Sequence, residues 1–116
     1  MIRKFFRSLG HALRGLKYVW REEHTFRIQS ACALCVVVAM IAFRFTYIEI
    51  TFLLLAIMMV LAGEVFNTLL EDILNIIEPR HHAIVGRLKD MMAGVVLVLS
   101  CGALAVGIVV ALHHFL

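Results

Sequence analysis

The sequence has few of the residues and tracts that are typical of linkers between domains. Its 116 residues include one proline, Pro79, and no serine-rich or glycine-rich tract. Linkers between domains are rich in such residues, so we expect one domain over residues 1–116. Of the three cysteines, Cys32 and Cys35 form a C-x-x-C pattern inside an apolar segment. A thiolate would be desolvated there, which argues against redox or zinc chemistry.

Charged residues are also scarce, and three long segments have none. Asp, Glu, Lys and Arg make up 16% of the chain, whereas 63% is hydrophobic and the mean hydropathy is +0.97. A soluble domain is typically about 45–50% apolar. The uncharged segments are residues 28–43, 50–63 and 91–112. Because a helix needs about 20 apolar residues to cross a bilayer, the sequence predicts transmembrane helices at about 27–45, 48–70 and 91–112.

Basic residues lie almost entirely on one side of these predicted helices. Seven precede the first helix and three lie between the second and the third, whereas only Arg44 lies between the first and the second. Lysine and arginine are enriched in cytoplasmic loops. We therefore expect the N-terminus in the cytoplasm and the C-terminus outside.

The residues before the first span form an amphipathic pattern. Their apolar positions recur at spacings of three and four, and these are Ile2, Phe5, Phe6, Leu9, Leu13, Leu16 and Trp20. Arginine and lysine occupy mostly the other faces. This pattern predicts a surface helix over about 2–22 that lies in the cytoplasmic membrane interface. A basic anchor helix with no further role is the simpler alternative.

Small residues recur along the third predicted span, at Ala103, Gly107 and Ala111. This spacing lets helices approach closely within a membrane. Three thin helices enclose little of a site, so we expect an oligomer with sites at its subunit boundaries.

A polar stretch, GEVFNTLLED at residues 63–72, ends the second apolar segment. Glu64, Asn67 and Glu71 stand at positions i, i+3 and i+7, which lie within about 60° of one another on a helix. Glu64 is the deepest of them and is expected near the inner head-group boundary. Ionisable residues at such depths are rare, and a functional role is the default hypothesis for them.

These residue types fit phosphoryl transfer to a lipid. A partly desolvated carboxylate such as Glu64 is a suitable base for a head-group hydroxyl. Glu71 and Glu23, on the water side, could hold Mg²⁺, which commonly binds one or two carboxylates plus substrate phosphates. Lys89 could contact phosphate oxygens. The sequence has neither a Walker-type glycine loop nor a kinase H-R-D motif, which excludes the known soluble kinase folds.

The residues alone leave other interpretations open. Glu64 and Glu71 could pair with Arg87 or Lys89 and only hold helices together. They could also belong to a proton or ion path. A non-enzymatic transporter or assembly subunit is a further alternative, although the first and third predicted spans have almost no polar residues to line a conduction path.

Four segments in this order resemble the prokaryotic diacylglycerol kinase and undecaprenol kinase family: WREEHTFR (20–27), GEVFNTLLE (63–71), PRHHA (79–83) and KDMMAGVVLV (89–98). The resemblance covers nearly the whole chain. It implies an all-α membrane protein that forms a homotrimeric helical bundle in the bacterial cytoplasmic membrane, with active sites shared between subunits. It also implies that the γ-phosphoryl group of ATP is moved to a lipid alcohol with Mg²⁺. No nucleic-acid partner is expected.

The resemblance further implies roles for individual residues. Glu64 would be the general base, and Glu23 and Glu71 would bind magnesium. Trp20 and Ala93, with Glu64, would border the lipid substrate. The residues expected to contact ATP are Lys4, His11, Glu23, Asn67, Glu71, Arg80, His81, His82, Lys89 and Asp90.

Three positions depart from the family pattern. Lys4 stands where some members have arginine, His11 where some have tyrosine, and Asn75 where aspartate is usual. The segments 79–83 and 89–98 look slightly nearer to the undecaprenol kinases. We therefore expect undecaprenol as the substrate, with diacylglycerol as a close second.

Overall fold

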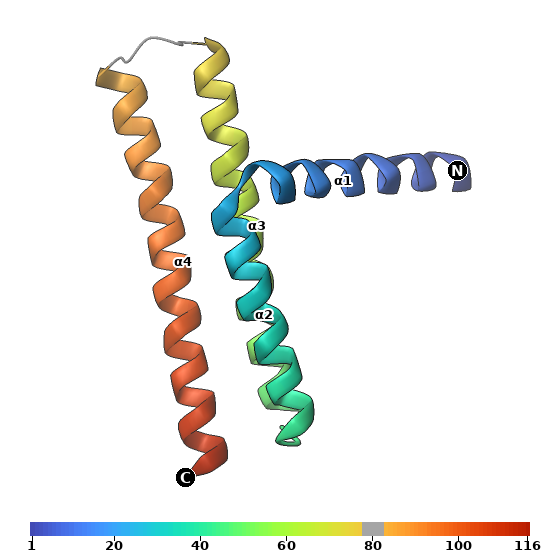
Figure 1. The fold of residues 1–116 in the computed structure, drawn as a ribbon, viewed down its shortest axis with the longest axis vertical. Coiled ribbons are helices and arrows are strands. Elements are labelled where there is room, and N and C mark those ends of the chain that lie inside the picture. Colours follow the sequence, from blue (N-terminus) through green and yellow to red (C-terminus); the bar gives the residue numbers. More distant parts are fainter. Residues whose placement is uncertain (78–82) are drawn as a thin grey trace.

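A computed structural model describes residues 1–77 and 83–116, and this part of the chain contains four helices (Figure 1). They are α1 (Ile2–Glu22), α2 (His24–Ala42), α3 (Tyr47–Ile77) and α4 (Ala83–Phe115). The last three are long and apolar enough to cross a membrane. The predicted fold class, an amphipathic N-terminal helix followed by three transmembrane helices, is confirmed.

Two of the helices extend well beyond their predicted spans. α3 continues from about residue 70 to Ile77, and α4 begins at Ala83 rather than near residue 91. The prediction gave each span only the length needed to cross a bilayer, but charged residues such as Glu, Lys and Arg are good helix formers and continue a helix. The predicted site residues Glu71, Lys89 and Asp90 lie on these added turns.

The first helix leaves the bundle sideways. α1 extends away from the three long helices, with the N-terminus at its far end (Figure 1). Its apolar side chains, including Phe5, Phe6 and Leu13, are exposed within the single chain. A helix of this pattern, lying across the spans, suits the interface between head groups and hydrocarbon.

α3 is the central element of the bundle. It packs against α4 along much of its length and also against α2 and α1. The small buried core joins Met40, Leu53 and Val110, one from each long helix. Gly63 of α3 lies so close to Leu99 of α4 that an added Cβ would overlap the leucine methyl group. The two helices can approach here because Gly63 has no side chain.

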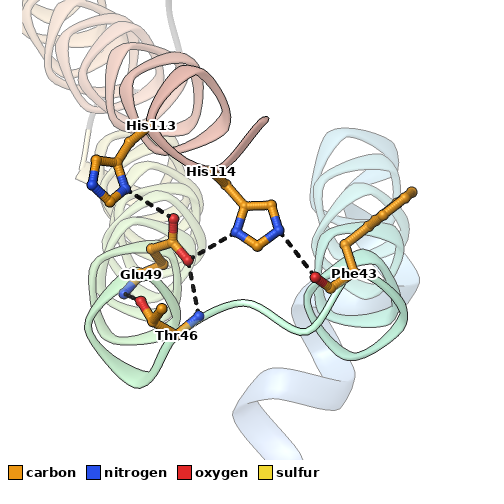
Figure 2. A network of polar contacts seen from close by, with 5 residues as sticks. All are labelled: Phe43, Thr46, Glu49, His113 and His114. Atoms are coloured by element: carbon orange, nitrogen blue, oxygen red, sulfur yellow. Dashed lines mark hydrogen bonds and ion pairs between the residues drawn. The ribbon is translucent and has the colours of Figure 1, made fainter. Parts of the chain in front are cut away.

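The turn between α2 and α3 is closed by polar contacts at the end of the bundle opposite residues 63–72. Arg44 has a φ of 55°, and Thr46 and Glu49 form a reciprocal capping box at the start of α3. Glu49 is buried and also contacts His113 and His114 of α4 (Figure 2). The end of α4 is thereby fastened to this turn.

Substituting Gly63 tests the close packing of α3 and α4. We expect Gly63→Leu to lower the free energy of unfolding by about 1–3 kcal/mol, the usual penalty for overpacking. Gly102→Leu, at a glycine with open space around its Cα, serves as the matched control and should change stability little. Thermal unfolding in detergent measures both. Equal midpoints for the two variants would contradict the contact.

Candidate active site

The elbow between α1 and α2 fixes the position of Glu23. The guanidinium of Arg27 donates to the carbonyl oxygens of Trp20 (2.8 Å) and Arg21 (3.0 Å) at the end of α1. The rings of Trp20 and Phe26 pack edge to face across the same elbow. Glu23, the one non-helical residue there, has an extended backbone that directs the chain into α2. These contacts therefore fix the backbone position from which the Glu23 carboxylate extends.

α3 carries the polar stripe of the predicted site. Glu64 is 4% exposed, whereas Asn67 and Glu71, one and two turns further along, are half-buried. Thr68 is fully buried, and its hydroxyl donates to the carbonyl oxygen of Glu64 (3.1 Å). The predicted polar stripe is thus present, with one buried carboxylate at its inner end and accessible oxygen atoms at its outer end.

The structure brings these carboxylates from two elements together. Glu64 lies within electrostatic range of both Glu23 and Glu71. Burial raises the pKa of Glu23, and repulsion from Glu71, Asp72 and Glu22 raises it further. Negative charge therefore accumulates at the junction of α1, α2 and α3, where a cation would be favoured.

Asp72 also ties α1 to α3. The hydroxyl of Tyr18 donates to its carboxylate (3.3 Å). The charge of Asp72, with smaller effects of burial and of the neighbouring Glu22 and Glu23, raises the pKa of Tyr18, because a phenolate would face these carboxylates. This contact was not predicted from the sequence, which gives no spacing signal for residues 54 positions apart.

α4 brings a lysine to the end of the α3 stripe. The ammonium group of Lys89 donates to the side-chain oxygen of Asn75 (2.9 Å), one turn beyond Glu71. Among residues 1–77 and 83–116, neither Glu64 nor Glu71 forms an ion pair with Arg87 or Lys89. The described contacts therefore do not support the interpretation that these carboxylates only hold helices together.

Other predicted site residues lie further away or outside the described part. Asp90 and Ala93 are exposed on α4 close to Lys89, and Trp20 is exposed at the elbow. The end of α1 that carries Lys4 points away from the bundle (Figure 1). Within one chain, the position of Lys4 therefore does not complete the carboxylate group.

Two further predictions for ATP contacts stand apart from the carboxylates. His11, on the exposed middle of α1, contacts the guanidinium of Arg14 (2.6 Å). The predicted contacts of Arg80, His81 and His82 fall outside the described residues.

The donor atoms present fit a magnesium ion that is shared with a nucleotide. In the described ranges no three His, Cys, Asp or Glu residues converge on one point as a closed metal site. Mg²⁺ needs no such cage, because it usually keeps water and substrate phosphates and takes one or two carboxylates from the protein. The mutual repulsion of Glu23, Glu71 and Asp72 is the feature of this structure that such a cation would relieve.

An apolar groove of about 570 Å³ runs along the bundle beside this group. Its lining on α3 ends at Leu61, three residues before Glu64, and its lining on α2 begins at Ile28, five residues after Glu23. Almost all of the lining is apolar. Gln29, also on α2, places a buried side-chain oxygen near that end, and this oxygen has no hydrogen-bond partner among the described residues. No pattern in the sequence singles out Gln29.

The arrangement combines an apolar groove, a buried carboxylate three residues beyond its lining on α3, and accessible carboxylates with a lysine further along. With three helices long and apolar enough to cross a membrane, these features indicate an integral membrane protein. The profile of the family described as prokaryotic diacylglycerol kinase matches residues 10–111. The chain belongs to this family and is a lipid kinase.

Relatives match between 81% and 97% of the chain at modest identity. The undecaprenol kinase of Bacillus subtilis (strain 168) is 29% identical over 96% of this chain and 90% of its own length. The diacylglycerol kinase of Escherichia coli (strain K12) is 26% identical over 97% of this chain and 92% of its own length. The diacylglycerol kinase of Haemophilus influenzae is 31% identical over 81% of this chain and 80% of its own length. Both substrate classes are therefore represented among proteins similar to this chain.

The raised pKa of Glu23 predicts how the binding of a divalent cation at this carboxylate would depend on pH. Protons compete with a cation for this carboxylate, so cation affinity should fall as the pH drops, and the fall should begin above the usual range of glutamate. Asp72→Asn removes a repulsion that raises the pKa, so the fall should move to lower pH. Titration of Mn²⁺ binding in nanodiscs across this range measures the effect, with Glu49→Gln as the control. If Asp72→Asn binds Mn²⁺ with the same pH dependence as the wild type, the inferred repulsion between Asp72 and Glu23 would be refuted.

Proposed function

We propose that the protein transfers the γ-phosphoryl group of ATP to the hydroxyl group of a membrane lipid, with Glu64 as the general base. The supporting observation is the position of Glu64, which is buried three residues beyond Leu61, where the lining of the apolar groove on α3 ends, and within electrostatic range of the more accessible Glu23 and Glu71. A lipid hydroxyl could approach from the groove and a nucleotide from the water.

In this proposal each side chain has one task. Glu64 accepts the hydroxyl proton as the lipid oxygen attacks the γ-phosphorus, and the bond to ADP breaks. Glu23 and Glu71 would hold Mg²⁺, which supplies positive charge to the phosphate oxygens. Lys89 would neutralise the phosphates, and Asn67 would orient the neighbouring carboxylates.

The nucleotide site would be completed by Asp90 and by a second copy of the chain. Lys4 and His11 lie on α1, which projects away from its own bundle (Figure 1). In a homotrimer, this helix of one subunit could reach the site of its neighbour. Arg80, His81 and His82 are proposed as further nucleotide contacts. This arrangement also gives partners to the many exposed apolar side chains of α2, α3 and α4.

The lipid chain would occupy the groove between α2, α3 and α4. Only the end beside Gln29 and Glu64 offers polar atoms, which suits an alcohol whose tail is apolar throughout. Trp20 and Ala93 would border its entrance. None of the described residues that line the groove is charged, so a conducting path through it is the less favoured alternative.

Undecaprenol is the slightly favoured substrate and diacylglycerol the close alternative. The likeness of segments 79–83 and 89–98 to the undecaprenol kinases supports undecaprenol. The identities to an undecaprenol kinase and a diacylglycerol kinase, 29% and 26%, are too similar to separate the two substrates. Both reactions would occur at the cytoplasmic face of a bacterial inner membrane, the side on which ten of the eleven Lys and Arg residues fall.

Phosphorylation of both lipids in competition tests the proposal. Purified protein in nanodiscs receives Mg²⁺, ATP and equal amounts of undecaprenol and diacylglycerol, and the two lipid phosphates are quantified. We expect undecaprenyl phosphate to form faster. Faster phosphatidic acid would reverse the substrate assignment, and no lipid phosphate from folded protein would overturn the proposed function.

Replacing Glu64 separates its role as a base from nucleotide binding. Glu64→Gln should lower kcat by about 10²–10⁴-fold, the usual contribution of a general base, while the affinity for ATP stays unchanged. Glu49→Gln is the matched control, because Glu49 is equally buried near the other end of α3. Size-exclusion profiles would verify that both variants fold. Loss of ATP affinity in Glu64→Gln would contradict the assigned role.

Filling the groove tests where the lipid chain lies. Gly107 lines the groove and Gly102 lies outside it, and neither has an atom within 4 Å of an added Cβ. We expect Gly107→Leu to raise KM for the lipid severalfold without changing KM for ATP, and Gly102→Leu to change neither. Steady-state kinetics in mixed micelles measures both constants. An unchanged lipid KM in Gly107→Leu would place the chain elsewhere.

A further inference from the structure

A second polar cluster lies at the end of the bundle opposite the candidate active site. Glu49 stands in the first turn of α3, 15 residues before Glu64, and is 5% exposed. His113 and His114, in the last turns of α4, both contact its carboxylate (Figure 2). Nothing in the proposed kinase reaction uses this cluster.

The Glu49 carboxylate is surrounded by nitrogen donors. Its Oε1 accepts from the backbone N–H of Thr46 (2.9 Å) and lies 3.1 Å from Nδ1 of His114, and its Oε2 lies 3.2 Å from Nδ1 of His113. An ionised carboxylate can accept all three of these bonds at once. Glu49 therefore links the turn before α3 to the end of α4.

His114 differs from His113 in facing an acceptor at each ring nitrogen. Its Nδ1 faces Glu49, and its Nε2 lies 3.0 Å from the backbone carbonyl oxygen of Phe43 (Figure 2). A neutral imidazole has one N–H and can donate only once, whereas the protonated ring donates from both nitrogens. On losing its proton, the ring would turn a lone pair toward one of these two oxygen atoms. The contacts around His114 are thus complete only in the charged form.

The neighbouring rings also suit a cation. The His114 ring lies over that of Phe45, with centroids 4.2 Å apart and planes 30° apart. Phe115 packs edge-on against both rings. A cation over an aromatic face is attracted by the negative face of the ring. The side chain of His114 is only 19% exposed, so water replaces these contacts poorly.

We propose that Glu49, His113 and His114 form a pH-sensitive clasp, closed while His114 is protonated, that fastens the end of α4 to the turn between α2 and α3. Unmodified histidines change charge between about pH 5 and 8, so the clasp would loosen toward alkaline pH. His113 makes one contact, which a neutral ring satisfies, and its side chain is 78% exposed. It therefore strengthens the clasp without switching it.

In the described part of the chain, Glu49 is the one ion-pair partner of His114. From the turn it meets the carbonyl oxygen of Phe43 and the ring of Phe45, and from α3 it meets Glu49. Arg44 and Tyr47, the remaining ionisable side chains of the turn and the start of α3, are exposed and form no ion pair with the cluster. The Glu49–His114 pair therefore controls the response to pH.

The clasp closes the end of the bundle where Met40 of α2, Leu53 of α3 and Val110 of α4 form the buried core. The apolar groove extends on α4 as far as Ala111, three residues before His114. Opening the clasp would free the last turns of α4 and widen this end of the groove. In the orientation proposed above, this end faces the outside, so external pH would set the rigidity of the outer half of the bundle. Only this last consequence rests on the proposed orientation.

Hydrogen exchange of the α4 terminus tests the clasp without nucleotide or lipid substrate. Protein in nanodiscs is compared at about pH 5.5 and about pH 8 as wild type, His114→Gln and the matched control His113→Gln. At the lower pH, we expect amides of residues 108–116 to exchange about tenfold faster in His114→Gln than in wild type, the order expected for one hydrogen bond to a charged group. At the higher pH the difference should vanish, and His113→Gln should keep the pH response of wild type.

Nitrogen NMR of the histidine rings gives a second test that needs no variant for its readout. Near pH 6 both ring nitrogens of His114 should have the shifts of an imidazolium, and His114→Gln serves only to assign the signal. A neutral His114 ring at that pH would overturn the proposal. An identical pH response of wild type and His114→Gln in hydrogen exchange would do so as well. Neither outcome depends on whether the protein phosphorylates a lipid.

Discussion

Charged side chains are strongly disfavoured in the hydrocarbon of a membrane, and this constraint determines where the chemistry of the molecule can lie. α3 has no charged residue between Ile50 and Gly63, and its acidic residues stand on either side of this run. Glu49 at one end is paired with histidines of α4. Glu64 and Glu71 toward the other end form no ion pair within the described residues.

The carboxylates at the two ends of α3 therefore differ in their surroundings. The paired carboxylate closes the bundle, whereas the unpaired ones collect with Glu23 and Asp72 and repel one another. A divalent cation that carries a nucleotide would supply the missing positive charge. The lining of the groove on α3 ends at Leu61, three residues before Glu64, so the site would join a water-soluble phosphate donor and a lipid acceptor at one level of the membrane.

Much of the fold and the outline of the site could be predicted from the sequence, because both depend on local patterns. Uncharged runs indicate spans, and a spacing of three and four places Glu64, Asn67 and Glu71 on one face. The helix ends were predicted less well, since charged residues continue a helix beyond the lipid. Contacts between distant segments leave no local pattern. The bonds from Lys89 to Asn75 and from His114 to Glu49, and the buried oxygen of Gln29, therefore appeared only in the structure.

The central claim is that the carboxylates at the junction of α1, α2 and α3 bind the nucleotide through magnesium. Equilibrium binding of a non-hydrolysable ATP analogue, with and without Mg²⁺, tests this claim most directly. The account predicts that removing Mg²⁺ weakens binding to the wild type by at least about tenfold, the size of one good charged contact. It also predicts that Glu23→Gln and Glu71→Gln lose most of this dependence on Mg²⁺. Equally tight binding of the metal-free analogue to the wild type would contradict the account.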